Sequence, residues 1–182
     1  MIIFCVFSGE WKIFNGNEIG TLLGWWQFKI YTELLAKDIS KKNLYFIAST
    51  VSSKMLQSIA TEEGVSFEVS IEQFLCGSCR WFKFGSSKIF TSRTSSLLFQ
   101  ETLTGFKWMG NRAYELEDDN RNKPKKVMLA FEESIGYMCG SQVLDKDGIS
   151  GAVRAAELIA YLDQSGMTLV DKLHDIYKRF VF

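Results

Sequence analysis

The sequence predicts a layered α/β domain. Segments with apolar residues at helical spacing alternate along the chain with short apolar runs that are typical of buried strands. The 182 residues are 47% hydrophobic and 23% charged, a composition typical of one globular domain. Lysine and arginine together number 21, as do aspartate and glutamate. This balance gives no overall field that would favour nucleic acid or an acidic membrane as partner.

The first half of the chain indicates two helices and two strands. A helix is expected over residues 17–37 with Asn17 as its cap, because apolar residues recur there at helical spacing. Residues 44–48 form an apolar run and are expected to be a strand. A second helix is expected to begin at Ser52 or Ser53 and to end at Gly64, and Val65 begins another strand.

The second half continues the alternation. A helix is expected over residues 104–117, a buried strand over 127–131, and a helix over 149–162 that ends near Gly166. Residues 145–148 are expected to form a polar turn that caps this last helix. His174, the one histidine of the chain, lies on a terminal amphipathic segment and is expected to be a packing or surface residue. Trp25 and Trp26 cannot both face one core, so one of them is expected to contact a neighbouring domain.

The run from Ala130 to Tyr137 carries the strongest indication of a site. Glu132, Glu133 and Ser134 follow the apolar strand directly, and ligands bind outside the carboxyl ends of strands in open parallel sheets. Carboxylates accept strong hydrogen bonds from sugar hydroxyls, and serine can donate or accept. These residues suit a polyol, although a solvated turn with two surface acids has the same composition.

Several blocks of the sequence resemble the α-D-phosphohexomutases, and most closely the phosphoglucomutase branch that includes the phosphopentomutases. The resemblance covers roughly residues 11–68 and 101–180 and rests on residues 15–20 (NGNEIG), 22–26 (LLGWW), 48–54 (ASTVSSK), 102–112 (TLTGFKWMGNR), 131–137 (FEESIGY) and 144–148 (LDKDG). Members of this family have four domains, and the chain resembles only the third. It implies a three-layer α/β/α domain with a small mixed sheet, whose loop holds the sugar hydroxyls.

The resemblance also implies roles for individual residues. Glu132 and Ser134 match the sugar-contacting pair, Thr104 matches a position at the bisphosphate, and Lys146 matches a substrate-binding lysine. Further candidates for substrate binding lie nearby: Lys107, Arg112 and Glu133. No catalytic and no metal-binding residue is expected in this chain. The family's phosphoserine, its Mg²⁺ loop and its phosphate loop belong to other domains, so Mg²⁺ and a sugar bisphosphate are expected for the complete enzyme.

Three hypotheses for the function remain open at this point. The first is a fragment of a phosphoglucomutase or phosphopentomutase, inactive alone, whose partners are a sugar phosphate and the missing domains. The second is a non-catalytic module for binding sugar phosphates or for interaction. The third is a fragment of a related synthase that makes glucose 1,6-bisphosphate from another phosphoryl donor. The sequence does not choose between hexose and pentose substrates.

The expected domain runs from residue 11 to 180 and is interrupted by an insertion at 69–100. This stretch contains seven serines and five phenylalanines and shows no stable period. It is interpreted either as a mobile surface loop or as untranslated sequence retained in the gene model. Residues 1–10 match nothing in the family.

The cysteines and the N-terminal run bear on location. The spacing of Cys76 and Cys79 is compatible with thiol exchange or half a zinc site, but no second pair accompanies them. Cys139 is expected to pack near the sugar loop. The apolar run at residues 1–7 is shorter than a membrane span and has no basic residue before it. A cytosolic protein with reduced thiols is expected.

Overall fold

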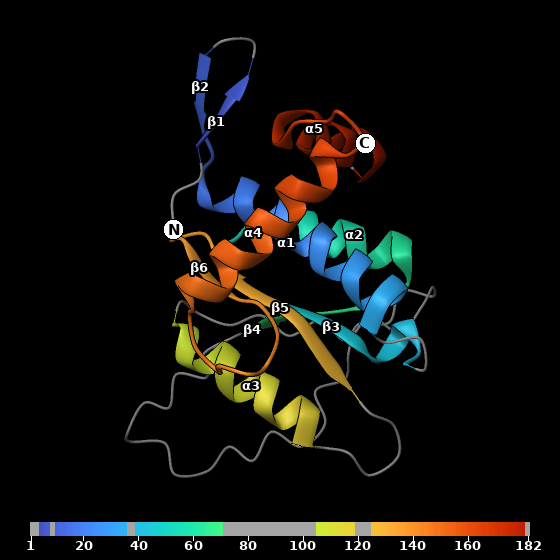
Figure 1. Ribbon diagram of the computed structural model, residues 1–182. Coiled ribbons are helices and arrows are strands. Elements are labelled where there is room, and N and C mark those ends of the chain that lie inside the picture. Colours follow the sequence, from blue (N-terminus) through green and yellow to red (C-terminus); the bar gives the residue numbers. More distant parts are fainter. Residues whose placement is uncertain (1–3, 8–9, 36–38, 71–104, 119–124, 181–182) are drawn as a thin grey trace, which may run out of the picture.

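A mixed four-stranded sheet forms the centre of the molecule. The computed structural model describes residues 4–7, 10–35, 39–70, 105–118 and 125–180 (Figure 1). The strand order is β4-β3-β5-β6, with β3 at Leu44–Ser49, β4 at Ser66–Ser70, β5 at Lys126–Glu132 and β6 at Gly136–Met138. β4, β3 and β5 run parallel, whereas β6 is antiparallel to β5.

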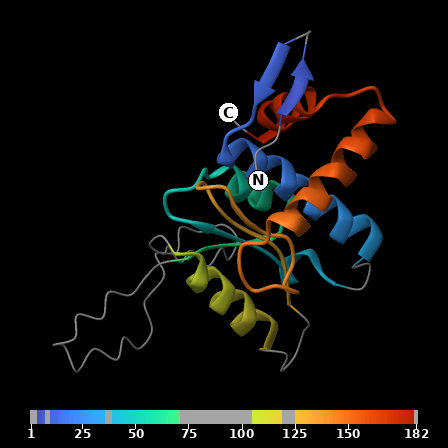
Figure 2. The same ribbon diagram turned by 60° about the vertical axis from the view of Figure 1, so that its left-hand side comes forward.

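Helices cover both faces of this sheet, so the predicted three-layer α/β/α arrangement is confirmed. One layer holds α1 (Gly16–Ile30), α2 (Met55–Glu63), α4 (Gly148–Asp163) and α5 (Leu169–Phe180), and α3 (Phe106–Asp118) lies on the opposite face (Figures 1 and 2). The connections from β3 to β4 and from β4 to β5 run in opposite directions across the sheet. Because such crossovers are right-handed, α2 and α3 must lie on opposite faces.

The core has two parts, one on each face of the sheet. The smaller part lies under α3 and includes Met109, Val127 and Ala130, while the larger part under α1 includes Met128 and Leu129. Met128 and Leu129 face the same side because the register of β5 against β3 shifts there, as in a β-bulge. The carbonyl of Met128 accepts hydrogen bonds from Gln27 Nε2 at 3.1 Å and from the backbone of Gly140 at 3.1 Å.

The cap of the first helix differs from the expectation. Asn15, not Asn17, caps α1: its side chain accepts from the backbone of Glu18, and the Glu18 side chain accepts from the backbone of Asn15, each at 2.9 Å. This reciprocal capping box satisfies two N–H groups at once, which a cap at Asn17 would not do. Asn17 Oδ1 instead accepts from the backbone N–H of Ser53 at 2.8 Å and ties the start of α1 to the β3–α2 loop.

Two features were not anticipated. β1 (Phe4–Phe7) and β2 (Glu10–Ile13) form an antiparallel hairpin that stands apart from the sheet (Figures 1 and 2), and β6 follows β5 after a three-residue turn.

The helix expected over 17–37 is an α-helix to Ile30 and continues as a π-helix over Tyr31–Leu35. The insertion predicted at 69–100 lies outside the described residues except for positions 69 and 70, so it stays a prediction.

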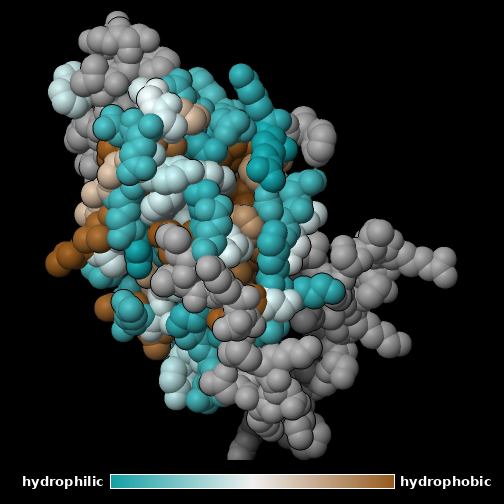
Figure 3. All heavy atoms as spheres, turned by 45° about the vertical axis from the view of Figure 1, so that its right-hand side comes forward, coloured by the Kyte–Doolittle hydropathy of each residue, from teal (hydrophilic) through white to brown (hydrophobic). Residues whose placement is uncertain are grey.

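The two tryptophans of α1 differ in burial, and the expected contact of one of them with a neighbouring domain stays a prediction. Trp26 is buried, and Trp25 lies beside the Tyr161 ring and 3.9 Å from Lys172 Nζ. Among the described residues, large apolar side chains that are exposed include Trp11 on β2 and Ile149 on α4. On the face shown in Figure 3, hydrophilic side chains cover most of the described surface, with hydrophobic ones between them. None of the described helices is both long and apolar enough to cross a bilayer.

Candidate functional site

Three segments meet at the carboxyl edge of the sheet. They are the turn between β5 and β6 (residues 133–135), the loop between β3 and α2 (residues 50–54), and the first residues of α1. β3 and β5 are parallel neighbours, so Ser49 and Glu132 at their ends lie at the same edge. The expectation that the site follows the carboxyl end of β5 therefore agrees with the topology of the sheet.

Glu132 and Lys146 are brought together. Glu132 ends β5 and is only 7% exposed, and Lys146 Nζ donates to its Oε1 at 2.6 Å from the loop between β6 and α4. The lysine side chain remains 47% exposed. Gly136 makes this contact possible, because a Cβ there would lie 2.4 Å from Lys146 Cδ and 3.0 Å from Glu132 Cγ. The result is a buried acceptor covered by a cation that solvent can reach.

Glu133 is held by two serines of the β3–α2 region. Its Oε2 lies 3.0 Å from Ser52 Oγ and 3.1 Å from Ser49 Oγ, within hydrogen-bond distance of both, and its backbone N–H donates to Ser52 Oγ at 3.1 Å. Burial by itself would raise the pKa of Glu133, but hydrogen bonds from its own backbone and from Ser52, Ser49 and Ser134 outweigh it and lower the pKa. The carboxylate is therefore stabilised in its charged form.

Ser134 and Ile135 form the tip of the turn. Ser134 is exposed, and its hydroxyl donates to Glu133 Oε1 at 3.4 Å. Ile135 has a φ of 62°, in the left-handed region that a β-branched residue rarely adopts. A left-handed third residue is typical of three-residue hairpin loops, where glycine normally occupies it. The turn thus presents the Ser134 hydroxyl to solvent at a cost in backbone strain.

The start of α1 packs directly against this turn. A Cβ at Gly16 would lie only 1.9 Å from the carbonyl oxygen of Glu133, so no larger residue fits without moving the backbone. The Tyr137 hydroxyl donates to the Gly16 carbonyl at 2.9 Å, and burial raises the pKa of Tyr137. Sequence reasoning did not assign roles to Gly16, Ser49 or Ser52, although all three fall in the blocks that resemble the family.

The remaining candidates lie on or before α3. Arg112 does not reach the turn: it donates to Glu68 at 2.6 and 3.0 Å and to Glu115 at 3.0 Å, and the hydrogen bond to Glu68 raises its pKa. Lys107 follows Phe106, whose ring centre lies 5.9 Å from Lys146 Nζ, and its own ammonium lies 5.3 Å from the Trp108 ring. Thr104 lies outside the described residues.

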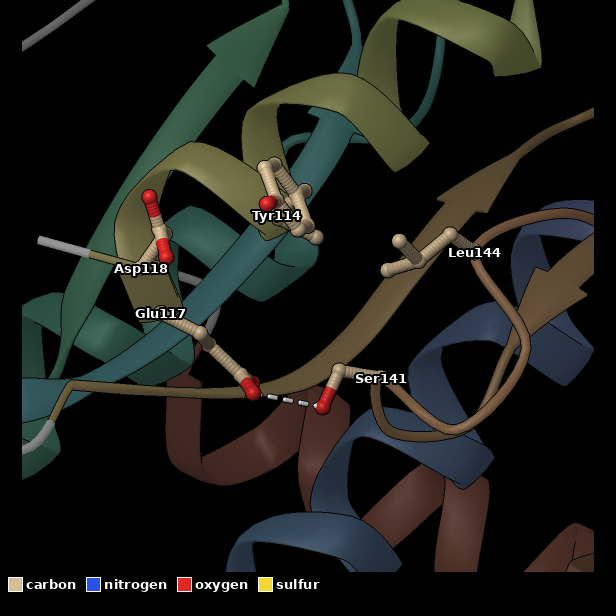
Figure 4. Close-up of a pocket in the computed structure, with 6 residues that line it drawn as sticks. Tyr114, Glu117, Asp118, Ser141 and Leu144 are labelled. Atoms are coloured by element: carbon tan, nitrogen blue, oxygen red, sulfur yellow. Dashed lines mark hydrogen bonds between the residues drawn. The ribbon is translucent and has the colours of Figure 1, made fainter.

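A shallow pocket lies elsewhere, between α3 and the loop after β6. It is lined by Ala113, Tyr114, Glu117, Asp118, Ser141 and Leu144 (Figure 4). The Glu117 carboxylate points to Ser141 and accepts from its hydroxyl at 2.7 Å, from Lys126 Nζ at 2.8 Å and from the backbone of Val127 at 2.9 Å. Its oxygens therefore join α3 to the start of β5.

Asp147 and Cys139 flank the loop that carries Lys146. The Asp147 side chain accepts from the Ile149 N–H at 2.9 Å and caps α4, which agrees with the predicted polar turn. That hydrogen bond lowers the pKa of Asp147. Among the described residues Cys139 is a free cysteine, and burial raises its pKa to about 12, so its thiol is protonated at neutral pH.

Comparison with known proteins decides the family. The family model described as phosphoglucomutase/phosphomannomutase, alpha/beta/alpha domain III, matches residues 91–180. Phosphopentomutase of Mus musculus is 43% identical over 173 residues, which cover 95% of this chain and 22% of that protein. Glucose 1,6-bisphosphate synthase of Homo sapiens is 38% identical over 173 residues, with the same coverage. The chain belongs to the α-D-phosphohexomutase family, as a domain III.

A solved structure supports the fold of this domain III. The crystal structure of a Thermus thermophilus protein named as a phosphomannomutase superposes with a TM-score of 0.58 at 15% identity. The match covers 97% of this chain and 28% of the other. The chain likewise spans about a fifth of the length of the curated relatives it matches, at 22% for phosphopentomutase. The activity of a complete protein is therefore a matter for proposal.

Proposed function

We propose that this domain III supplies the sugar grip of a phosphomutase that interconverts sugar 1-phosphates with hexose 6-phosphates or pentose 5-phosphates through a bisphosphate. The observation that carries the proposal is the Glu132–Lys146 pair beside the exposed Ser134 hydroxyl, at the carboxyl end of β5. Relatives that are phosphopentomutases and phosphoribomutases support the same reaction class. The chain alone is expected to be inactive.

The proposed work of the site is recognition. The Glu132 carboxylate would accept hydrogen bonds from sugar hydroxyls, and a charged acceptor strengthens each of them. The Lys146 ammonium, which donates to Glu132, would turn towards a phosphate and attract it as a point charge. A bisphosphate that must bind in two orientations needs contacts that serve both, and hydroxyl contacts meet this requirement.

Thr104 and Lys107 extend the proposed site on the side of α3. By resemblance Thr104 would lie at the bisphosphate, and Lys107 follows Phe106, whose ring neighbours Lys146. Glu133 and Arg112 are proposed for supporting roles, because the described contacts of both are made to other protein groups. Thus the first contacts to substrate are assigned to Glu132, Ser134, Lys146 and Thr104.

Mg²⁺ belongs to this proposal for the complete protein. When bound, it would neutralise charge on the transferring phosphoryl group. The described residues hold no group of three or more histidine, cysteine, aspartate or glutamate side chains that could ligate a metal ion. On the family resemblance, the metal, the phosphoserine and the phosphate loop are assigned to other domains. A cytosolic location, in keeping with the free thiol of Cys139, is also part of the proposal.

The test is the activity of the complete protein encoded by the full-length transcript. Wild type is expected to convert glucose 1-phosphate or ribose 1-phosphate to its isomer. Glu132→Gln removes the charge from the hydroxyl contacts and should lower kcat/KM about tenfold or more, since hydrogen bonds to charged groups contribute about 1.5–3 kcal/mol. Glu157→Gln is the matched control, because Glu157 pairs with Arg154 on α4 away from the turn. Equal activity of Glu132→Gln and wild type would refute the assignment.

The second candidate is a glucose 1,6-bisphosphate synthase, favoured by relatives of that name at 38% identity. The same assay separates the two. A mutase needs a trace of bisphosphate and no other phosphoryl donor, whereas a synthase forms net bisphosphate only when a donor is supplied. A non-catalytic module would bind the sugar bisphosphate without turning over either substrate.

A further inference from the structure

We propose that Glu133 is a positioning residue, which latches the β5–β6 turn to the β3–α2 loop and thereby holds Glu132 and Ser134 in place for the sugar. This inference rests on the proposed function and deepens it. Glu133 was expected among the possible substrate contacts. Its partners indicate that it acts through its two neighbours instead.

The Glu133 carboxylate is directed towards buried groups of the protein. Its Oε2 lies 3.0 Å from Ser52 Oγ and 3.1 Å from Ser49 Oγ. Ser49 is 0% exposed and Ser52 is 3% exposed, so a sugar cannot reach either hydroxyl. This oxygen of Glu133 is therefore engaged within the protein.

The hydroxyls of Ser49 and Ser52 have two protons for three contacts, one with each other and one each with Glu133 Oε2. Their oxygens lie 2.6 Å apart, and each hydroxyl has one proton to donate. One serine therefore donates to the other, and the second donates to Glu133. Ser52 Oγ also accepts from the backbone N–H of Glu133 at 3.1 Å. Ser52 thus holds the backbone of Glu133, and one of the two serines holds its carboxylate.

The turn must also sustain backbone strain. Ile135 holds a φ of 62°, and a non-glycine residue in the left-handed region persists only where the surroundings determine it. Besides the Glu133 latch, the turn is bounded by Gly16, which allows the Glu133 carbonyl to approach α1, and by the Tyr137 hydroxyl on Gly16. Without the latch the turn is expected to relax and move Ser134.

The hydrogen bonds also favour a charged latch. They lower the pKa of Glu133 against the opposing effect of burial, so the carboxylate is ionised at neutral pH. A glutamine at this position would keep an acceptor oxygen for the serines and lose the charge. Glu133→Gln should therefore retain part of the latch, whereas Glu133→Ala removes it.

The latch is tested first without sugar, in the 182-residue chain. Amide hydrogen exchange of residues 133–136 should become about tenfold faster, or more, in both Ser52→Ala and Glu133→Ala. Ser165→Ala is the matched control, because Ser165 donates to Leu162 at the opposite end of α4 from Lys146. Melting curves show whether each variant is folded. Unchanged exchange of the turn in folded Ser52→Ala would overturn the latch.

The second measurement is kcat/KM of the complete protein. Positioning predicts that Ser52→Ala and Glu133→Ala lower it by similar factors, that Glu133→Gln retains more activity than Glu133→Ala, and that the double variant is no worse than Glu133→Ala. If Glu133 instead binds sugar, Glu133→Ala lowers kcat/KM and Ser52→Ala leaves it unchanged, which overturns the proposal. A wild-type protein without mutase activity would contradict the proposed function, while the exchange experiment still decides the latch.

Discussion

At the residue scale, two glycines of the candidate site have different close neighbours. Gly16 faces the Glu133 carbonyl, a backbone atom that cannot turn aside, whereas Gly136 faces the stem of Lys146, which can. The same added methyl group should therefore shift the backbone at Gly16 and displace a side chain at Gly136. Substitution of the two glycines should therefore separate the stability of the turn from its binding of the sugar.

Gly16→Ala should destabilise the chain by about 1–3 kcal/mol, the usual cost of overpacking. Gly136→Ala should cost less stability but displace Lys146 from Glu132 and weaken binding of a sugar bisphosphate. Urea unfolding and isothermal titration of the two variants check this. Equal losses of stability, or intact binding in Gly136→Ala, would contradict the geometry described for Lys146.

A pH dependence follows from Glu133. Its pKa is lower in the folded chain than its ordinary value of 4.5, so ionisation of Glu133 stabilises the fold above that value. The contribution is lost as the pH falls from 4.5 through the folded pKa. Glu133→Gln should therefore lose less stability than wild type over this acidic range, measured as unfolding free energy in urea. Parallel curves for the two proteins would contradict the lowered pKa.

The site residues show how far sequence reasoning reaches. Glu132, Ser134 and Lys146 were predicted from motif blocks, and the structure brings Glu132 and Lys146 within hydrogen-bond distance. The partners of Glu133 were not predicted, because Ser52 is 81 residues away in the chain and joins it only through the pairing of β3 with β5. Arg112 was expected near the substrate, but its pairing with Glu68 depends on how α3 packs against β4.

At the scale of elements, local patterns located most helices and strands. α2 ends at Gly64, β5 begins near Val127 and α4 begins near Ile149, as expected from apolar spacing and end signals. β6 was missed because three residues carry no measurable period. The hairpin of β1 and β2 was missed as well, because an apolar run as short as residues 1–7 does not by itself indicate a strand pairing.

The cap of α1 is the clearest misprediction, and it is testable. The sequence Asn15-Gly16-Asn17-Glu18 holds the capping-box signal from Asn15 to Glu18, which outweighs an asparagine at position 17. Asn15→Ala should cost about 1 kcal/mol of stability through loss of the cap. Asn17→Ala should instead release the β3–α2 loop, because Asn17 accepts from Ser53.

Helicity and loop exchange distinguish these two variants. Circular dichroism on heating reports loss of the α1 cap, and amide exchange of residues 50–54 reports release of the loop. A larger loss of helicity in Asn17→Ala than in Asn15→Ala would contradict the assignment of the cap.

At the scale of the whole molecule, several apolar side chains of α4 are exposed. Ile149 is 80% exposed, Val153 51% and Ile159 45%, whereas Leu158 and Leu162 on the same helix are buried. Val153→Lys should change the unfolding free energy of the chain by less than about 0.5 kcal/mol, as surface substitutions usually do. Leu158→Lys is the contrasting variant and should unfold the chain. A large loss in Val153→Lys would mean that Val153 is covered in solution.

The extent of the domain is also a property of the whole molecule. Relatives match 95% of the chain, and the family model matches residues 91–180. The domain from residue 11 to 180 with an insertion at 69–100 stays a prediction. The insertion hypothesis is decided by the messenger RNA. A message that joins the codons for Phe67 and Thr102 closely would mean that the intervening residues are not translated, and a message that encodes them would favour a loop.

The most direct test of the central claim is titration of the isotope-labelled 182-residue chain with glucose 1,6-bisphosphate, followed by amide chemical shifts. We expect saturable changes in amide chemical shift, concentrated at residues 132–136 and around Lys146. Glu132→Gln should bind more weakly, and Glu157→Gln should bind as wild type does. Shifts that are absent, or that centre on the pocket at Tyr114 and Ser141, would contradict the claim that this domain grips the sugar at the carboxyl end of β5.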